Sequence, residues 1–221
     1  MDNGRAAAFF DFDETLITVS SGRMGFQWMR DNGMVPTGWM VKVVAASVLY
    51  NQHIMSEERM GEILVTFYKG KSLDEFKKHA PWFYETYLKP HLAPTMVARA
   101  DYHREAGHAL VLISGAPRYV LEPVAEDLGF DHLVCSDLAE GDDGLLTGKP
   151  LGALCVDFNK KRLAMKLARD ENISMTRSFA YGNHHADIPL LSAVGHPHAV
   201  EPTQPLARVA RARNWPILSH E

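Results

Sequence analysis

Hydrophobic and polar residues follow each other along the chain in blocks whose lengths predict an α/β fold. Residues 6–12 are small, apolar and aromatic and run into acids, which is typical of a buried strand. After Pro94, helical and strand-like blocks alternate, and this predicts a parallel sheet with helices on both faces. The helices are expected at 95–106, 118–128, 159–170, 188–193 and 204–213, the strands at 108–113, 132–135, 178–181, 198–200 and 215–218, and a hairpin at 140–149.

Residues 20–90, called the helical insert below, differ from the rest of the chain. They are rich in Met, Trp, Lys and Glu at helix-like spacing and contain few β-branched runs. Ser56 and Ser72 each open a helix-start pattern, the second with the spacing of a capping box. The sequence therefore predicts a core domain of residues 1–19 and 91–221 and a helical domain of residues 20–90, inserted after the first strand.

Length and charge narrow the class of protein. The 221 residues allow one large domain, or one domain and an insert, with a sizeable core. A composition of 46% hydrophobic and 23% charged residues is ordinary for a globular protein and excludes general disorder. The formal net charge of −4 argues against a protein that binds nucleic acid by bulk phosphate neutralisation.

Cysteine content and hydropathy predict a cytoplasmic protein. Cys135 and Cys155 cannot form a disulfide framework, so a reduced intracellular chain is expected. The first residues have no signal-peptide pattern. The longest apolar run, residues 39–50, is interrupted by Lys42 and is shorter than the roughly 20 residues that span a bilayer. This run predicts a buried or interfacial helix.

Reactive side chains follow three of the expected strands. Asp11 and Asp13 follow the first, Ser114 and Gly115 the second, and residues 182–187 the third. Because ligands bind at the carboxyl ends of parallel strands, these groups are expected at one edge of the sheet. Two clustered carboxylates need a cation or a proton. Mg²⁺ meets that need and accepts a phosphate ligand, so one carboxylate could attack phosphorus while the other carries a proton.

Simpler interpretations of these residues remain open. Ser114 could only cap the following helix, or its hydroxyl and the Gly115 amide could hold a phosphate oxygen. Lys160 and Lys161 could be a solvated pair, or one of them could face the site and neutralise phosphate charge. Asp187 could be an ordinary N-cap. Several histidines are interpreted as surface or structural residues rather than metal ligands: His184, His185, His196 and His198.

Together the motifs resemble those of the haloacid dehalogenase superfamily of phosphatases. The first matches residues 10–16 (FDFDETL), the second residues 112–115 (LISG), the third Lys160, and the fourth residues 182–187 (GNHHAD). The match covers nearly the whole chain, and the helical insert resembles the cap of the phosphoserine-phosphatase-like branch. The resemblance implies a Rossmann-like core with a helical cap and a Mg²⁺-dependent phosphatase activity.

The resemblance also implies a role for each motif residue. Asp11 would be the nucleophile that forms an aspartyl-phosphate, and Asp13 the general acid and base. Ser114, Gly115 and Lys160 would bind the transferring phosphoryl group, a reaction in which positioning and charge neutralisation dominate. Lys160 is preferred over Lys161 because its spacing to the fourth motif matches the family without a gap. Mg²⁺ would lie between four residues: Asp11, Asp13 through its backbone carbonyl, Asn183 and Asp187.

Two features depart from the family pattern. Asn183 stands where the family has an acid that ligates magnesium, so weaker metal binding is expected, with Asp187 or a histidine as a compensating group. Ser20 stands nine residues after Asp11, where phosphoserine phosphatases carry the acid that reads the substrate amine, and their carboxylate-reading arginine falls near Glu62. A charged substrate group without its partner costs on the order of several kcal/mol of recognition, so phosphoserine is not the expected substrate.

The expected function is therefore hydrolysis of a small organic phosphate, without nucleic acid and without stable membrane insertion. A phosphotransferase that uses the same intermediate is one alternative, and a catalytically weak phosphate-binding protein, suggested by Asn183, is another. The sequence does not indicate an oligomeric state. Apolar residues of the insert form either its core or a pocket for a lipid-like substrate: Met24, Phe26, Trp28, Met29, Met34, Trp39 and Met40.

Overall fold

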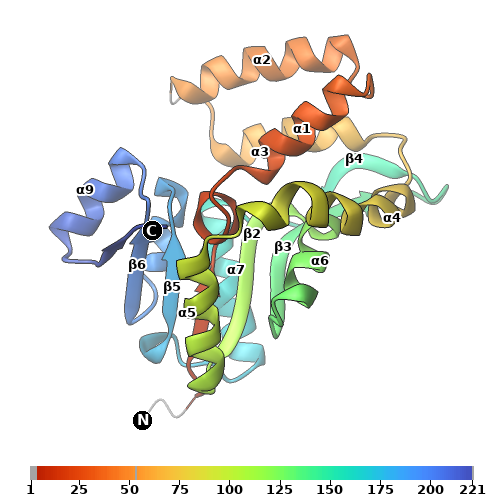
Figure 1. Cartoon of the computed structure of the whole chain (residues 1–221). Coiled ribbons are helices and arrows are strands. Elements are labelled where there is room, and N and C mark those ends of the chain that lie inside the picture. The colour runs from red at the N-terminus through yellow and green to blue at the C-terminus, as the bar shows by residue number, and fades with distance from the viewer. Residues whose placement is uncertain (1–3, 53, 221) are drawn as a thin grey trace.

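The computed structural model describes residues 4–52 and 54–220. Within them lies a seven-stranded sheet of order β4-β3-β2-β1-β5-β6-β7 (Figure 1). Neighbouring strands pair in parallel except β3 and β4, which form the expected antiparallel hairpin. The expected α/β fold is confirmed. The strands are β1 (Ala7–Phe10), β2 (Ala109–Pro117), β3 (His132–Glu140), β4 (Leu146–Leu151), β5 (Phe179–Gly182), β6 (His196–Val200) and β7 (Ile217–Leu218).

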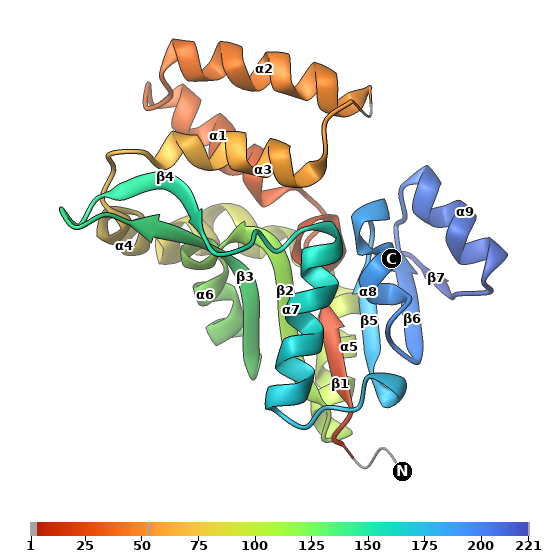
Figure 2. The same ribbon diagram turned by 180° about the vertical axis from the view of Figure 1, so that it is seen from behind.

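Helices cover both faces of the sheet, because its central strands are apolar on both sides. In β1, Ala8 and Phe10 pack in a core with residues of α5 (Pro94–Glu105) and α6 (Arg118–Asp127). Ala7 and Phe9 point the other way, into a core shared with three further helices (Figures 1 and 2). These are α7 (Asp157–Asp170), α8 (Ile188–Leu191) and α9 (Gln204–Ala212).

Four α-helices lie between β1 and α5 in the described chain, and the helical insert is therefore helical as expected. In Figure 1, α1 (Ser21–Asp31), α2 (Thr37–Asn51) and α3 (Glu57–Val65) stand above the carboxyl ends of the strands. Below them, α4 (Leu73–Phe83) packs on α6. The division of the chain into residues 1–19 with 91–221 and residues 20–90 stays a prediction.

The two helix starts expected in the insert differ in their capping. The Ser56 hydroxyl accepts a hydrogen bond from the Arg59 backbone N–H at 3.2 Å. Ser72 also precedes its helix, but within the described residues its side chain makes no cap hydrogen bond. The Glu75 carboxylate instead lies 3.9 Å from His79 Nε2, one turn further along α4. The prediction of a capping box at Ser72 is therefore wrong.

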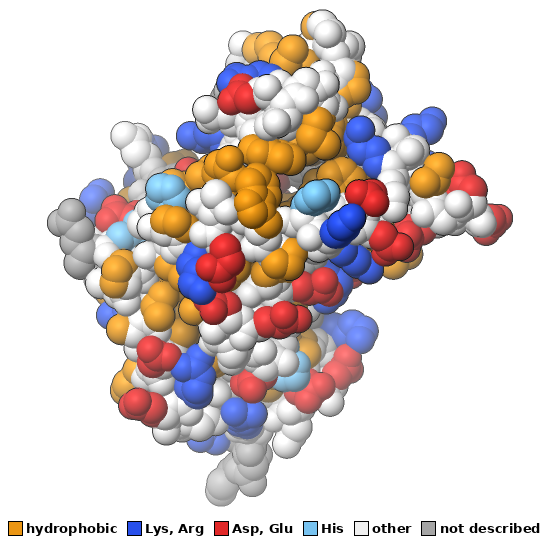
Figure 3. All heavy atoms as spheres, turned by 45° about the vertical axis from the view of Figure 1, so that its right-hand side comes forward, with side chains coloured by type: hydrophobic (Ala, Val, Ile, Leu, Met, Phe, Trp, Pro, Cys, Tyr) orange, Lys and Arg blue, Asp and Glu red, His pale blue; other side chains and the backbone are white. Residues whose placement is uncertain are grey.

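The apolar residues of the insert pack partly against each other and partly remain at the surface. The Trp39 ring lies 5.1 Å from that of Phe67, and this contact favours the interpretation of these side chains as core. On α2, in contrast, Val41, Val44 and Val48 are 65%, 62% and 51% exposed. Hydrophobic side chains also gather at the surface where the helical insert meets the rest of the chain (Figure 3). No helix in the described part of the chain is long and apolar enough to cross a membrane.

Candidate active site

The first motif begins where β1 ends and the chain turns sharply. The Asp11 backbone N–H donates to the Tyr181 carbonyl of β5, and Thr15 Oγ1 donates to Asp11 Oδ2 at 3.0 Å. Residues 12–16 then form one wide helical turn, in which Asp13 and Glu14 leave the helical conformation. Glu14 adopts φ +53°, the left-handed region that residues other than glycine rarely enter. This turn directs several carboxylates toward the carboxyl edge of the sheet.

Lys160 joins two buried carboxylates from different strand ends. Its Nζ lies 2.6 Å from Asp11 Oδ1 and 2.6 Å from Asp187 Oδ1. Lys160, Asp11 and Asp187 are only 5%, 7% and 4% exposed, whereas the neighbouring Lys161 is partly exposed. Of the two lysines that the sequence left open, Lys160 is the one that points into the site. We call Asp11, Lys160 and Asp187 the buried triad.

Burial and charge shift the pKa values within the buried triad. The pKa of Asp11 is raised to about 7, mainly by burial; the charge of Lys160 opposes this shift and the charge of Asp187 contributes to it. Burial alone would lower the pKa of Lys160, but the charges of Asp11 and Asp187 outweigh it and raise that pKa. Lys160 therefore stays positively charged, and near neutral pH the site is close to taking up a proton on Asp11.

Asp13 is held at the start of α1. Its Oδ1 accepts the backbone N–H of Ser21 at 2.5 Å, which fixes the carboxyl group at the first residue of that helix. Burial raises the pKa of Asp13, although the hydrogen bonds from Ser21 partly offset the effect. A carboxyl group with a raised pKa retains its proton more readily and can deliver it to a leaving group.

Ser114 and Gly115 lie at the irregular end of β2, which runs further than the sequence predicted. Ser114 is buried, and its Oγ accepts the Ala116 backbone N–H at 3.2 Å. The N-cap position of the following helix is Pro117, which makes no side-chain cap hydrogen bond, so the simple N-cap interpretation of Ser114 is wrong. A Cβ at position 115 would lie 3.0 Å from Val156 Cγ1, so glycine suits this close approach. The Ser114 hydroxyl retains its own proton for donation.

The fourth motif follows β5 and depends on a glycine. A Cβ at Gly182 would lie 2.7 Å from Asp187 Cγ, so only glycine lets the Asp187 side chain fold back beside the strand. Asp187 Oδ2 accepts the His184 backbone N–H at 3.0 Å and its Oδ1 faces Lys160. Asn183 is buried and its Nδ2 donates to Glu14 Oε2 at 3.2 Å. The structure thus places a carboxylate, Glu14, beside the amide that replaces the expected acid.

Comparison with known proteins identifies the family. A family model described as haloacid dehalogenase-like hydrolase matches residues 8–192. The chain belongs to this family. The expected hydrolase assignment is thereby confirmed. The "Inhibition of morphological differentiation protein" of Streptomyces azureus is 30% identical, over 97% of this chain and 78% of that protein. A histidinol-phosphatase of Neisseria meningitidis is 27% identical, over 96% of this chain and 97% of its own length.

Solved structures show the same fold. A protein with unknown function from Bordetella pertussis Tohama I superposes with a TM-score of 0.88 at 24% identity, covering 99% of this chain and all of that one. A substrate-bound phosphoserine phosphatase superposes with a TM-score of 0.70 at 18% identity, covering 98% of this chain and 93% of that one. The expected resemblance to the phosphoserine-phosphatase-like branch is confirmed at the level of the fold.

Some residues that the sequence did not assign to the site also lie close to it in this hydrolase. Glu57, the first residue of α3, lies beside His184 and His185 of the fourth motif. The pKa of Glu57 is raised to about 7, mainly by burial and secondly by the charge of Asp187. The His184 pKa is lowered, first by burial and then by His185. In the sequence, Glu57 looks like an ordinary acid in the first turn of a helix, so no sequence pattern indicates that it lies beside the fourth motif.

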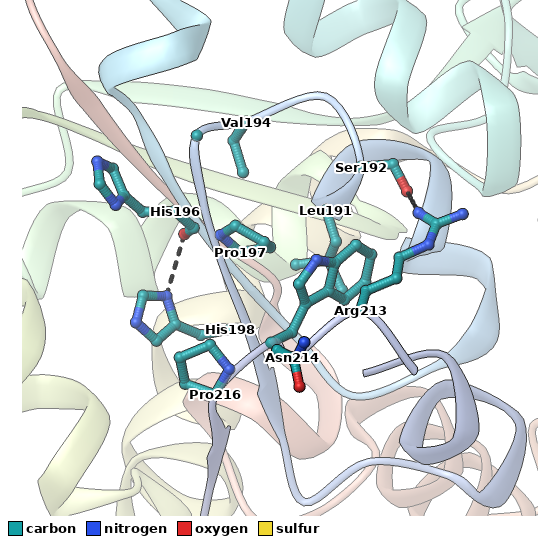
Figure 4. A pocket seen from close by; sticks show the side chains of 11 residues that line it. Leu191, Ser192, Val194, His196, Pro197, His198, Arg213, Asn214 and Pro216 are labelled. Carbon is teal, nitrogen blue, oxygen red and sulfur yellow. Dashed lines mark hydrogen bonds between the residues drawn. The ribbon is translucent and has the colours of Figure 1, made fainter. Parts of the chain in front are cut away.

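Ser20, Glu62, His196 and His198 lie outside the buried triad. The Ser20 hydroxyl caps α1 by accepting the Arg23 N–H, and Glu62 pairs with Arg59 on the exposed side of α3. The His196 ring stacks on Phe179. His196 and His198, interpreted as structural, line a surface hollow of about 490 Å³ at the start of β6 (Figure 4). Arg213 closes one side of this hollow by donating to Ser192 Oγ.

Proposed function

We propose that this hydrolase is a Mg²⁺-dependent phosphomonoesterase that acts on a small organic phosphate. The observation that carries the proposal is the buried triad, in which Lys160 Nζ contacts Asp11 and Asp187 at 2.6 Å each. A carboxylate and an ammonium group buried at the end of β1 form a compact site for a phosphoryl group. The phosphatase names of several relatives, including a phosphoserine phosphatase of Mycobacterium tuberculosis at 27% identity, support the same reaction class.

The donor set fits a magnesium ion. Asp11, Asp187, the Asn183 amide and the Asp13 backbone carbonyl supply the oxygen ligands that Mg²⁺ prefers, and we propose them as its ligands. Within the buried triad, Lys160 balances only one of two carboxylates, and Glu14 adds a further negative charge 3.2 Å from Asn183. When bound, Mg²⁺ would neutralise charge on the phosphate and the carboxylates.

In the first proposed step, a carboxylate oxygen of Asp11 attacks phosphorus and the bond from phosphorus to the ester oxygen breaks. Asp13 donates its proton to the departing alkoxide, a role that its raised pKa favours. Lys160, the Ser114 hydroxyl and the Gly115 N–H hold the phosphoryl oxygens. Thr15 keeps the Asp11 carboxylate oriented through its hydrogen bond to Oδ2.

In the second step, Asp13 takes a proton from water, and the resulting hydroxide attacks the phosphorus of the aspartyl-phosphate. The bond between phosphorus and the Asp11 oxygen breaks, inorganic phosphate leaves, and the Asp11 carboxylate is restored. Asp13 ends the cycle protonated, ready for the next substrate. The sequence of events balances without an external acid or base.

The substrate is proposed as a phosphate ester other than phosphoserine. Ser20 occupies the amine-reading position and its hydroxyl is engaged in capping α1, so no carboxylate is offered there. The exposed valines of α2 keep a lipid-like phosphate among the candidates. A panel of sugar phosphates, amino-acid phosphates, histidinol phosphate, nucleotides and lipid phosphates would rank these classes by phosphate release.

The direct test measures phosphate release from an aryl phosphate with Mg²⁺ and with a chelator. We expect Mg²⁺-dependent turnover in the wild type and none in Asp11→Asn, with Lys161→Gln as a control that keeps activity. Phosphate transfer to an added alcohol, detected by product analysis, would instead indicate the phosphotransferase alternative. A lack of turnover over the whole panel would favour the phosphate-binding alternative and overturn the proposal.

A further inference from the structure

A cluster of metal-ligating side chains lies beside the buried triad and has no part in the proposed reaction. It comprises Glu57 of the helical insert and His184 and His185 of the fourth motif, and we call it the Glu–His–His cluster. One ligand atom from each residue lies within 4.8 Å of the other two. His184 Nδ1 is 3.9 Å from Glu57 Oε2, and the centroids of the two histidine rings are 4.0 Å apart.

We propose that the Glu–His–His cluster binds a transition-metal ion of the Zn²⁺ type and thereby links the insert to the core. Two imidazoles and one carboxylate are a donor set that suits zinc, whereas Mg²⁺ prefers oxygen ligands alone. The site would be chemically distinct from the oxygen-rich magnesium site formed by Asp11, Asn183 and Asp187. Three protein ligands leave a fourth position for water or an anion.

The geometry needs only a small contraction to hold the ion. With zinc–ligand bonds of about 2.0–2.1 Å, ligand atoms in a tetrahedral site lie about 3.3 Å apart, so shifts of roughly 1 Å suffice. The Glu57 and His184 side chains are 28% and 33% exposed, which leaves an entry route from solvent. The His184 ring accepts the Asp187 backbone N–H, but that N–H also donates to the His184 carbonyl at 3.0 Å. The ring can therefore exchange this bond for a metal.

The placement of the ligands gives the ion a mechanical role. Glu57 opens α3, whereas both histidines sit on the loop that carries Asn183 and Asp187. The neighbouring Glu58 already accepts a hydrogen bond from Asn159 of α7 at 3.0 Å, so the start of α3 rests on the core (Figure 2). A bound ion would hold the insert closed over the buried triad.

The test is a calorimetric titration of zinc chloride into the full chain with Mg²⁺ in large excess, which saturates the oxygen-rich site. We expect one zinc ion per chain in the wild type. Glu57→Gln and His185→Gln should weaken binding by about a hundredfold or more, since loss of even an outer partner of a ligand costs about 10–100-fold. Glu58→Gln, on the same helical turn, should bind zinc like the wild type.

A second readout separates this site from the magnesium site and from misfolding. Zinc should raise the melting temperature of the wild type and of Asp11→Asn, but not that of Glu57→Gln, whose circular dichroism should match the wild type. Zinc binding that survives Glu57→Gln and His185→Gln but is lost in Asp11→Asn would overturn the proposal, because the ion would then occupy the magnesium site. Absence of zinc binding to the wild type would overturn it equally, whatever the outcome of the phosphatase assay.

Discussion

Replacement of Lys160 by methionine is the most informative perturbation of the buried triad. It removes the cation that contacts Asp11 and Asp187 at 2.6 Å and leaves two buried carboxylates without it. Breaking a buried ion pair by removing one partner costs about 3–5 kcal/mol, because the remaining charge stays buried. We therefore expect Lys160→Met to lower the free energy of unfolding by about 3–5 kcal/mol near neutral pH without metal.

The loss should grow with pH, and this dependence identifies its cause. In the wild type the pKa of Asp11 is already raised from 3.8 to about 7, and without Lys160 it must rise further. A carboxyl group with a raised folded-state pKa binds protons in the folded chain that the unfolded chain has released, so stability falls as pH rises toward that pKa. Over each pH unit in which the folded chain holds one such proton and the unfolded chain does not, the free energy of unfolding falls by about 1.4 kcal/mol.

Urea unfolding followed by circular dichroism at about pH 6 and about pH 8.5 measures this effect. Lys166→Met is the matched control: it breaks an exposed ion pair with Asp170 on the same helix, and such pairs contribute about 0–1 kcal/mol. Adding Asp11→Asn to Lys160→Met should recover part of the loss. If Lys160→Met costs no more than Lys166→Met, or its cost does not depend on pH, the electrostatic account of the buried triad is refuted.

Two further predictions concern metal affinity and acid stability. In magnesium titrations, Asn183→Asp should bind the ion about tenfold tighter than the wild type and Glu14→Gln correspondingly weaker, because the charge of the ligands sets cation affinity. Weaker binding by Asn183→Asp would show that the fourth motif has been wrongly assigned to the metal. Burial and the neighbouring His108 lower the pKa of His103 from 6.5 to about 4. As the pH falls, the unfolded chain therefore takes up a proton on His103 at a higher pH than the folded chain does. The free energy of unfolding should then fall by up to about 3 kcal/mol between about pH 7 and pH 4. Urea unfolding should show a flatter dependence of this free energy on pH for His103→Gln, but not for the exposed His79→Gln.

The central strands and the motif order could be predicted because they depend on local patterns. Residues 7–10 form one continuous apolar run, and such a run is stable only when both faces are covered. Parallel pairing of β1 with β2 and β5 then brings the ends of three strands to one edge, which is why Asp11, Ser114 and Asp187 could be expected near each other. The choice of Lys160 over Lys161 came from family spacing, and the burial of Lys160 agrees with it.

Features that depend on contacts between distant segments could not be predicted. The ends of β2 and β3 run beyond the predicted strands because they pair with each other past an irregularity, at Pro117 and Ser136. Ser72 matches a capping pattern, yet Glu75 turns toward His79 rather than back to the helix start. Glu57 reaches the fourth motif only because α3 folds over the core, a relation between residues more than a hundred positions apart.

The position of Glu14 changes the interpretation of Asn183, which replaces the acid that the family carries in its fourth motif. The fourth motif considered alone has lost an acid, and weak metal binding would follow. In the folded chain the left-handed backbone at Glu14 brings its carboxylate 3.2 Å from the Asn183 amide, so a negative charge remains beside the site on the opposite loop. Such a conformation costs on the order of 1–3 kcal/mol outside glycine and persists only where its surroundings hold it. The strain at Glu14 therefore favours the hypothesis that a negative charge beside the proposed metal site has been relocated from position 183 to Glu14 rather than lost.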